Sequence, residues 1–387
     1  LFGREVAMQI LIPAAAGVEA SVKRQLRSMG YGDCPAVQGR VSLAGDWADV
    51  ARLNVQLRAG ERVLLVLSRF PAPDFDALFE GVSAIAWEEF CSPHSQIMMD
   101  GKCWASTLMA VKAAGGVVKK AIVERLKNRL GVRTLDERGE RVVVNFDIYE
   151  NVATVSLDTS GDGLHKRGYR VRTYDAPLRE TTAAAMVESS FFRAGKPFAD
   201  VFCGSGTIPV EAALYMRRIA PGKLRGFDFE KWKCAPHDAL ARAREEAADG
   251  EVRGPLPQLE ASDISPRAVE LARFHAARAG VGGDIRFSVR DMRAFSSSEP
   301  FGVIISNPPY GERLKEEGLS ALYRDFGRMY RALPDWSCVF LSSYVNAERA
   351  FGGNVNKKRR ICNAKLTCTL FTYAGKKPEN DNSKKIS

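Results

Sequence analysis

The sequence lacks features that define several protein classes. Its 387 residues include no apolar run near the roughly 18 residues that a membrane-spanning helix needs, and its start shows no secretory pattern. Eight cysteines form no Cys-x-x-Cys pair, and the four histidines lie far apart, so no spacing typical of metal ligands is present. We therefore expect a cytoplasmic protein with reduced cysteines and no metal site.

The charge is strongly positive and unevenly distributed. The net charge is +10, and residues 331–387 contain eleven Lys and Arg against four Asp and Glu. Such a balance favours a polyanionic partner such as nucleic acid, because cationic side chains neutralise phosphates, although a basic tail can also be simply solvated. With 45% apolar residues, the chain is long enough for two or three globular domains.

The N-terminal part has the pattern of a small α+β domain followed by a second one. We expect the first domain at residues 1–71 and the second at residues 72–157. The strands are expected at 6–12, 41–43, 63–70, 95–100, 142–148 and 152–157, and the helices at 18–29, 47–55, 75–85 and 117–130. A polar, glycine-rich stretch at 159–163 then predicts a domain boundary.

From residue 158 to 376 the pattern alternates between strands and helices. Such repetition predicts an α/β domain with a doubly wound, Rossmann-like parallel sheet. Strands are expected at 198–203, 258–263, 285–289, 303–306 and 337–342, helices at 178–192, 208–218, 267–279 and 319–333, and a final antiparallel strand at 365–373. Residues 219–257 resemble an insertion, and residues 377–387 form a polar basic tail.

The tetrapeptide Asn307, Pro308, Pro309 and Tyr310 follows the apolar strand expected at 303–306. The two prolines stiffen the loop, so the Asn307 side-chain carbonyl and the Pro308 carbonyl could both accept hydrogen bonds from a planar amino group. Tyr310 could stack on a base. These features predict a catalytic loop that positions an exocyclic amine for methylation, although Asn-Pro also occurs in plain surface turns.

A glycine-containing loop joins the first strand of this domain to a helix. Gly204 and Gly206 permit a tight turn and close approach to a ligand. Pro209 stands where a dinucleotide fingerprint needs a third glycine, and no Lys-Ser/Thr pair follows, so NAD and a P-loop nucleotide are disfavoured. The acid Asp200 in the loop instead suits the positively charged end of S-adenosylmethionine.

Further acids occur at the ends of the next two expected strands. Asp263 is placed for ribose hydroxyls and Asp291 for an adenine amino group, because ligands of open α/β sheets bind at the carboxyl ends of strands. Each acid alone could be a helix cap or turn residue. The predicted cofactor set is Asp200, Phe202, Cys203, Gly204, Ser205, Gly206, Thr207, Asp263, Ile264, Asp291, Met292 and Asn307.

Over nearly its whole length the chain resembles the THUMP-domain class I RNA methyltransferases, especially bacterial enzymes that form N2-methylguanine in 23S rRNA. The segments that carry the resemblance are residues 84–89, 118–126, 167–170, 176–181, 200–207, 229–232, 262–264 and 307–313. The resemblance implies a ferredoxin-like subdomain, a THUMP module that presents RNA, and a methyltransferase domain that uses S-adenosylmethionine.

The predicted function is therefore transfer of a methyl group to the exocyclic N2 of a guanine in 23S rRNA or a pre-ribosomal intermediate. Adenine-N6 methylation of DNA or RNA is an alternative, because Asn-Pro-Pro-Tyr recognises an amino group that both purines carry. A non-catalytic RNA-binding factor of ribosome assembly is another. The residues expected to contact RNA are Lys119, Lys120, Arg125, Lys127, Arg167, Arg170, Lys357, Lys358, Arg359 and Arg360. For the helix that carries the first four, a solvated charged face is the alternative.

Overall fold

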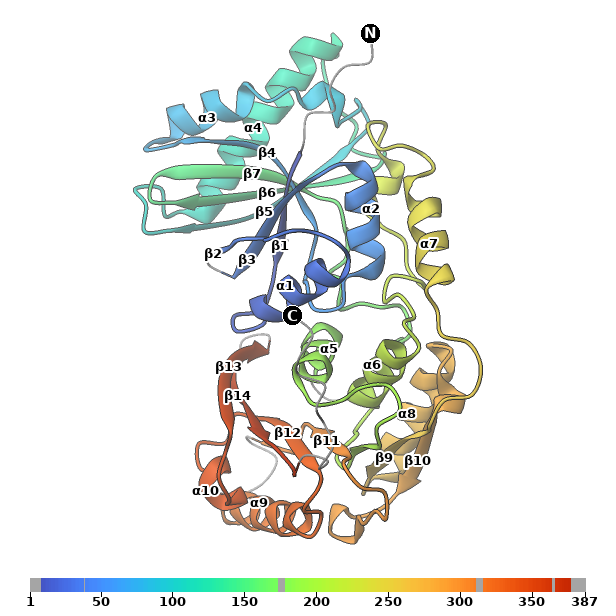
Figure 1. The fold of residues 1–387 in the computed structure, drawn as a ribbon. Coiled ribbons are helices and arrows are strands. Elements are labelled where there is room, and N and C mark those ends of the chain that lie inside the picture. Colours follow the sequence, from blue (N-terminus) through green and yellow to red (C-terminus); the bar gives the residue numbers. More distant parts are fainter. Residues whose placement is uncertain (1–7, 38, 173–177, 311–315, 364–365, 377–387) are drawn as a thin grey trace. The chain divides into compact units, whose positions relative to one another are not determined.

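A computed structural model describes residues 8–37, 39–172, 178–310, 316–363 and 366–376, and the chain divides into two compact units (Figure 1). Unit 1 contains the described residues up to Ala14, then Leu26–Leu164 and Arg225–Ala247. Unit 2 contains Ala15–Gln25, His165–Leu224 and the described residues from Ala248 onward. Each unit is therefore assembled from several separate stretches of the chain.

Unit 1 is built on a seven-stranded sheet with the order β2-β3-β1-β4-β7-β6-β5. Strands β5 and β6 pair in parallel, and the other pairs are antiparallel. The strands are β1 (Met8–Pro13), β2 (Ala36–Val37), β3 (Arg40–Gly45), β4 (Leu64–Pro71), β5 (Gln96–Trp104), β6 (Arg141–Tyr149) and β7 (Val152–Asp158). The helices are α2 (Trp47–Gln56), α3 (Phe75–Ser83), α4 (Val111–Leu130) and the short η1 (Trp87–Glu89), while α1 (Glu19–Ser28) spans the division between the units.

Local chemistry accounts for the helix ends in unit 1. The side chains of Asp46 and Asp74 accept hydrogen bonds from the first turns of α2 and α3, as N-cap residues do. Gly131 caps the C-terminus of α4 with a φ of 66°, in the left-handed region that glycine adopts without strain. Helix α4 also starts six residues before the expected position, at Val111, and it continues through Gly115, which faces the Phe146 ring of β6.

Part of the expected insertion belongs to unit 1. It contains the 3-10 turn η2 (Asp228–Lys231) and most of α7 (Ala239–Asp249), drawn in yellow in Figure 1. Asp228 pairs with Arg141 of β6 at 2.6 Å, and the buried Trp232 donates its indole N–H to the Arg141 carbonyl at 3.1 Å. This segment therefore packs with the sheet of the N-terminal sequence.

Unit 2 is built on a second seven-stranded sheet, with the order β10-β9-β8-β11-β12-β14-β13. Strands β10, β9, β8, β11 and β12 are parallel, whereas β14 and β13 are antiparallel to their neighbours. The strands are β8 (Phe198–Asp200), β9 (Leu259–Asp263), β10 (Ile285–Val289), β11 (Val303–Ser306), β12 (Ser337–Ser342), β13 (Lys357–Asn363) and β14 (Leu366–Tyr373). This mixed, mostly parallel sheet confirms the predicted Rossmann-like class.

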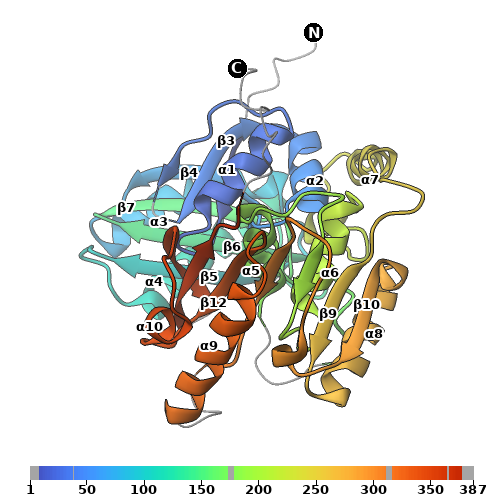
Figure 2. The ribbon, with the colours of Figure 1, turned by 60° about the horizontal axis from the view of Figure 1, so that its bottom comes forward.

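The helices of unit 2 connect these strands. They are α5 (Glu180–Ser189), α6 (Thr207–Met216), α8 (Pro266–Arg278), α9 (Glu316–Arg331) and α10 (Ala347–Phe351), with the short turns η3 (Gly282–Asp284) and η4 (Met292–Ala294). Figure 2 shows α8 beside β9 and β10. Strand order reverses next to β8, because the chain goes to β9 on one side and later to β11 on the other. Ligands of such sheets bind at this switch point, at the carboxyl ends of the strands.

No helix among the described residues is both long and apolar enough to cross a membrane.

Candidate active site

Four polar side chains predicted for the site lie at the carboxyl ends of adjacent parallel strands. Asp200 ends β8, Asp263 ends β9, Asp291 follows β10 by two residues, and Asn307 directly follows β11. Because these four strands are consecutive neighbours in the sheet, one edge of the sheet presents all four residues. The structure thus assembles at a single edge the residues that the sequence separates by more than a hundred positions.

Asp200 is buried, with 1% of its surface exposed, and only part of its carboxylate is satisfied. Its Oδ1 accepts hydrogen bonds from Ser306 Oγ at 2.7 Å and from the Phe202 amide at 3.1 Å, while Oδ2 has no partner among the described residues. Burial raises the pKa of Asp200 to about 7, against the opposing effect of the Ser306 hydrogen bond. A ligand cation near Oδ2 would restore the ionised form.

The two glycines of the loop after β8 serve different purposes. Both have positive φ, 50° at Gly204 and 85° at Gly206. A Cβ atom at Gly206 would lie 2.9 Å from the Cβ of Ala272, so this glycine permits close packing against α8. A Cβ at Gly204 would meet no atom within 4 Å, which leaves the loop backbone open to a ligand at that point.

Asp263 links the loop to the end of β9. Its Oδ2 accepts from the Gly204 amide and its Oδ1 from the Ser265 amide, both at 2.9 Å. Each carboxylate oxygen can accept a second hydrogen bond, so hydroxyl groups of a ribose could still bind there. The next residue, Ile264, is 69% exposed, and an apolar side chain beside such an acid could cover a flat aromatic ligand.

Other members of the predicted cofactor set have structural contacts. Cys203 is buried, which raises the pKa of its thiol well above the ordinary value and makes it inert as a nucleophile. Met292 is part of the hydrophobic core. Phe202 packs edge-on against Phe326, with ring centroids 5.2 Å apart. Asp291 caps η4 and pairs with Arg293 at 2.9 Å, so part of its carboxylate is already occupied.

Ser205 and Thr207, the remaining members of the loop, are buried and contact residues outside the loop. The Ser205 carbonyl lies 2.9 Å from Nδ1 of His275, a buried residue of α8. Thr207 Oγ1 accepts from Arg170 at 2.6 Å. These contacts fix the shape of the loop where α6 begins.

The loop after β11 is held by residues behind it. The Pro309 carbonyl accepts from the hydroxyl of Tyr323 at 3.3 Å, and Tyr323 is in turn 2.6 Å from the Ser342 hydroxyl. Asn307 Oδ1 is buried and has no hydrogen-bond partner among the described residues. An unsatisfied buried acceptor in a braced loop is suited to a substrate that donates an N–H group.

Tyr310 is half-buried beside this acceptor. Burial raises the pKa of its hydroxyl to about 12, a shift that hydrogen bonds from the side chains of Asn363 and Asn307 oppose. The side-chain amide nitrogen of Asn307 donates this hydrogen bond to Tyr310, so its side-chain oxygen remains available to accept one from a substrate. The extension at residues 311–313 lies outside the described residues.

The structure gives Arg167 and Arg170 a role different from the predicted contact with RNA. Arg167 is buried, with 2% of its surface exposed, and pairs with the buried Glu211 at 3.3 Å. Arg170 donates to Thr207 and to the Leu178 carbonyl. Arg167 is thus tied to α6 and Arg170 to Thr207 at the end of the loop, and these contacts leave neither guanidinium group free to reach an RNA backbone.

The predicted basic face of α4 is largely paired with carboxylates. Arg125 forms two hydrogen bonds with Glu88, at 2.8 and 2.9 Å, and a third with the Ser83 carbonyl at 2.8 Å. Lys119 pairs with Glu137 at 2.9 Å, and Lys120 with Glu124 at 3.7 Å. Lys127 is half-buried.

The second predicted RNA cluster lies on β13, an edge strand that the sequence did not predict. Lys357, Lys358 and Arg360 are exposed there and Arg359 is half-exposed, while Lys358 pairs with Glu348 at 2.9 Å.

Sequence reasoning missed the residues that hold the site in place. Ser306 donates to Asp200 and also accepts from the Val201 amide at 3.1 Å, so it ties β11 to the start of the cofactor loop. A polar residue at the end of an otherwise apolar strand could have indicated this role. For Tyr323 and Ser342, which meet only in the folded chain, no local pattern was available.

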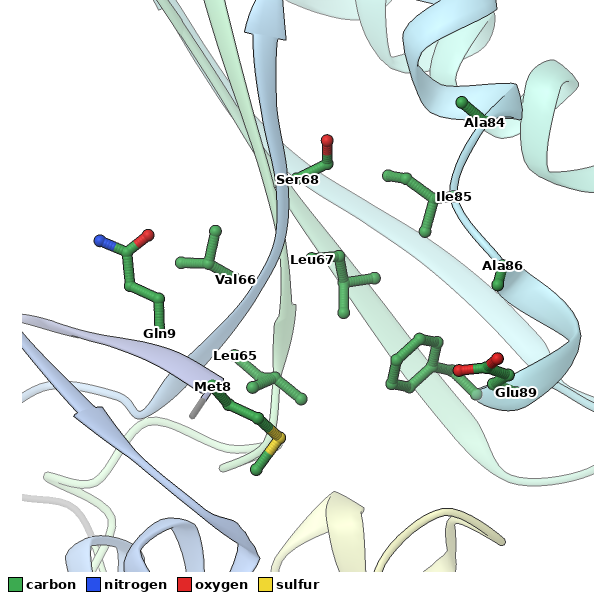
Figure 3. Close-up of a pocket in the computed structure, with 11 residues that line it drawn as sticks. Met8, Gln9, Leu65, Val66, Leu67, Ser68, Ala84, Ile85, Ala86 and Glu89 are labelled. Carbon is green, nitrogen blue, oxygen red and sulfur yellow. The ribbon is translucent and has the colours of Figure 1, made fainter. Parts of the chain in front are cut away.

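A hollow of about 490 Å³ in unit 1 is a separate feature (Figure 3). It lies between β1, β4 and residues 84–90, and most of its lining is apolar, as Met8, Leu65 and Ile85 illustrate. Glu89 is the single carboxylate among the lining residues. The edge of the unit 2 sheet is the better candidate site, because it combines two buried acceptor atoms that have no partners among the described residues with an open glycine loop.

Among the residues that the structure describes, no group of three or more His, Cys, Asp or Glu side chains is arranged to hold a metal ion.

Three family models match the chain in sequence order. They are an RlmL ferredoxin-like domain at residues 9–64, a THUMP domain at 72–158 and an RMKL-like methyltransferase domain at 167–372. YpsC of Bacillus subtilis (strain 168), whose name assigns it provisionally as an RNA methyltransferase, is 38% identical over 370 residues, which are 95% of this chain and 96% of that protein.

Two solved structures are similar over nearly their full length. One, from Listeria monocytogenes str. 4b F2365, is described as a predicted N6-adenine-specific DNA methylase; it is 39% identical, covers 96% of this chain and 97% of its own, and has a TM-score of 0.90. The other, SMU.472 complexed with SAH, is 34% identical, covers 97% of this chain and 100% of its own, and also has a TM-score of 0.90.

Proposed function

The chain belongs to the family of RMKL-like methyltransferases with ferredoxin-like and THUMP domains, and we propose that it methylates the exocyclic N2 of a guanine in 23S rRNA. Its cofactor is S-adenosylmethionine, which supplies an electrophilic methyl group. The proposal includes a cytoplasmic location, where rRNA and the cofactor are both available.

The residues at the sheet edge fit this cofactor. Asp200 offers an unsatisfied carboxylate oxygen to its cationic end, and Asp263 has acceptor capacity left for ribose hydroxyls. Gly204 leaves room for close approach, and the exposed Ile264 could cover the adenine. A relict, non-catalytic fold would have no need to keep these groups together, which argues against the assembly-factor alternative.

The buried Asn307 Oδ1, which has no hydrogen-bond partner among the described residues, is the single observation that carries the proposed chemistry. An exocyclic amine that donates to this oxygen and to the Pro308 carbonyl would have its nitrogen lone pair directed toward the methyl group. The amine needs no strong base, because it loses a proton readily once it is methylated. A base in a helix must leave its stack to reach such a loop, and Tyr310 is proposed to stack on it.

RNA is favoured as the substrate by the THUMP domain and by the name of the B. subtilis relative. Adenine-N6 methylation is the second candidate, because the Listeria relative is described as an adenine-specific DNA methylase and adenine also carries an exocyclic amine. The exposed cations of β13 are proposed to contribute phosphate contacts in either case.

Mass spectrometry of nucleosides tests the proposal. Ribosomal RNA from a deletion strain should lose one N2-methylguanosine, and the wild-type gene should restore it, whereas an Asn307→Ala gene should not. Loss of N6-methyladenosine would instead support the second candidate. Unchanged modification in both rRNA and DNA would contradict both assignments.

A further inference from the structure

A basic hollow of about 580 Å³ lies in unit 1 and has no part in the site described above. One wall comes from residues 92–94 and 138–140, on the loops that lead into β5 and β6. The other wall comes from Lys231 and Lys233, which the sequence places more than 90 positions later. The volume lies within the range of binding sites for small molecules and for parts of larger ligands.

The wall formed by Lys231 and Lys233 is anchored firmly. Trp232, between the two lysines, is buried; its ring contacts Trp47 edge-on at 6.5 Å, and its N–H binds the Arg141 carbonyl. Lys231, the last residue of η2, and Lys233 flank Trp232 in the sequence, and both lysines are exposed. The buried Trp232 therefore fixes the position of the backbone that carries them.

The opposite wall is also ordered by its own contacts. The Ser92 amide donates to Ser95 Oγ at 2.7 Å, and both serine hydroxyls donate to the Glu140 carboxylate. His94 Nδ1 lies 2.8 Å from Asp136. The acid that lines the hollow, Glu140, is thus satisfied by neutral hydroxyl groups, and it takes up none of the cations in the hollow.

Arg138, Lys231 and Lys233 are exposed, and within the described ranges none of the three forms an ion pair with a carboxylate. They differ in this respect from Lys119, Lys120 and Arg125 of α4, which are all paired. Lys231 and Lys233, together with Arg138, which also interacts electrostatically with the Asp136 carboxylate, give the hollow a local positive potential that attracts anions. In unit 1 the hollow therefore has more free positive charge than the paired cations of α4.

We propose that this hollow binds phosphates of the RNA backbone and so helps to hold the substrate of the methyltransferase. The inference rests on the proposed function, because it takes RNA as the substrate. Lysine side chains bind phosphate as point charges without reading base edges, and Trp232 is too buried to stack on a base. The contacts are therefore independent of sequence, and they involve internal phosphates of the chain.

The test measures binding of the full-length protein to an in vitro transcript of 23S rRNA by filter binding from low to moderate salt. In Lys231→Glu/Lys233→Glu, affinity should fall roughly tenfold at low salt, and the salt slope of log K should decrease by roughly 0.7 for each lost phosphate contact. Lys119→Glu/Lys120→Glu is the matched control, with the same change of charge in the same unit, and it should remain within about twofold of the wild type, because these lysines are already paired. Lys231→Arg/Lys233→Arg should restore binding.

The controls separate failure of this inference from failure of the proposed function. S-adenosylhomocysteine affinity and thermal unfolding of the Lys231 and Lys233 variants should equal those of the wild type, since both lysines are exposed and belong to unit 1. If Lys231→Glu/Lys233→Glu bound the transcript with the affinity and the salt slope of the wild type, the role of the hollow in RNA binding would be overturned, and the proposed function would be unaffected. A wild-type protein that binds no 23S transcript would overturn the proposed substrate as well. Phosphatase treatment of the transcript should change nothing, and a loss of binding after treatment would overturn the assignment to internal phosphates.

Discussion

Asp200 and Asn307 in unit 2 retain buried acceptor atoms without partners among the described residues, whereas Arg125 and Lys119 on α4 of unit 1 are paired with carboxylates. Both sets stand out in the sequence. The positions of the first set follow from topology, because parallel neighbouring strands end at one edge. The second set depends on Glu88 and Glu137, which approach α4 from other elements. The sequence thus predicts where polar residues at strand ends will lie more reliably than it predicts which surface cations will remain unpaired.

The largest effect is expected for Asn307→Ala. It removes the acceptor for the reacting amine, so kcat should fall by about two to three orders of magnitude, as it does when other single positioning groups are lost. Cofactor affinity should stay within a few fold. Single-turnover methylation and calorimetric titration with S-adenosylhomocysteine measure the two quantities. Activity within tenfold of the wild type would remove Asn307 from the catalytic role.

Asp263→Ala should have the opposite pattern, with cofactor binding weakened first. Hydrogen bonds to charged groups contribute about 1.5–3 kcal/mol, which corresponds to roughly a 10- to 100-fold increase in Kd. Asp291→Ala is the matched control: its carboxylate already pairs with Arg293, so the loss should be smaller. Equal Kd values for the wild type and Asp263→Ala would show that β9 does not bind the ribose.

The strands that form the site follow well from local pattern. The bounds expected for β10, β11 and β12 agree with the structure, because β11 and β12 are short, mainly apolar runs and β10 alternates apolar with polar residues. Strand β13 was missed, since the run of four cations from Lys357 to Arg360 has no apolar alternation. The early start of α4 was missed because Gly115 suggests a helix break, although it is accommodated beside Phe146.

The features of the fold and the site that the sequence did not predict depend on contacts between residues far apart in the chain. Residues 225–247 join unit 1 because Asp228 meets Arg141, 87 positions earlier, and because Trp232 packs against Trp47. Arg167 was expected at the surface, but it lies in the core with Glu211. The periodicity of apolar residues describes one helix or strand at a time. It therefore cannot predict which charged side chain will be buried by a different element of the fold.

A pH titration sharpens the comparison, because Asp200 is a buried acid that has no ionic partner in the described part of the chain. Its pKa is about 7, above the usual range for Asp, so the free protein binds a proton below neutral pH. A cationic ligand favours the ionised form; its affinity should therefore rise, by up to about tenfold, between pH 6 and pH 7.5 and then level off. Asp200→Asn cannot ionise, and it should bind more weakly with no such dependence. A wild-type Kd that stays constant over this interval would contradict contact between Asp200 and the charged end of the cofactor.

The smallest effect on RNA binding is expected for Arg125→Ala. Because Arg125 joins α4 to Glu88 and to the Ser83 carbonyl, its removal should lower the free energy of unfolding by about 1–2 kcal/mol, after allowance for solvent screening of partly exposed side chains. Affinity for a 23S rRNA transcript should stay within about twofold, since this cation is already neutralised. Chemical denaturation and filter binding measure the two quantities, and Lys120→Ala, which loses only an exposed helical pair, should change neither. Strongly weakened RNA binding in Arg125→Ala, with wild-type stability, would show that α4 is an RNA-binding face. The contrast between the paired cations of α4 and the acceptors of unit 2 that lack partners among the described residues would then fail.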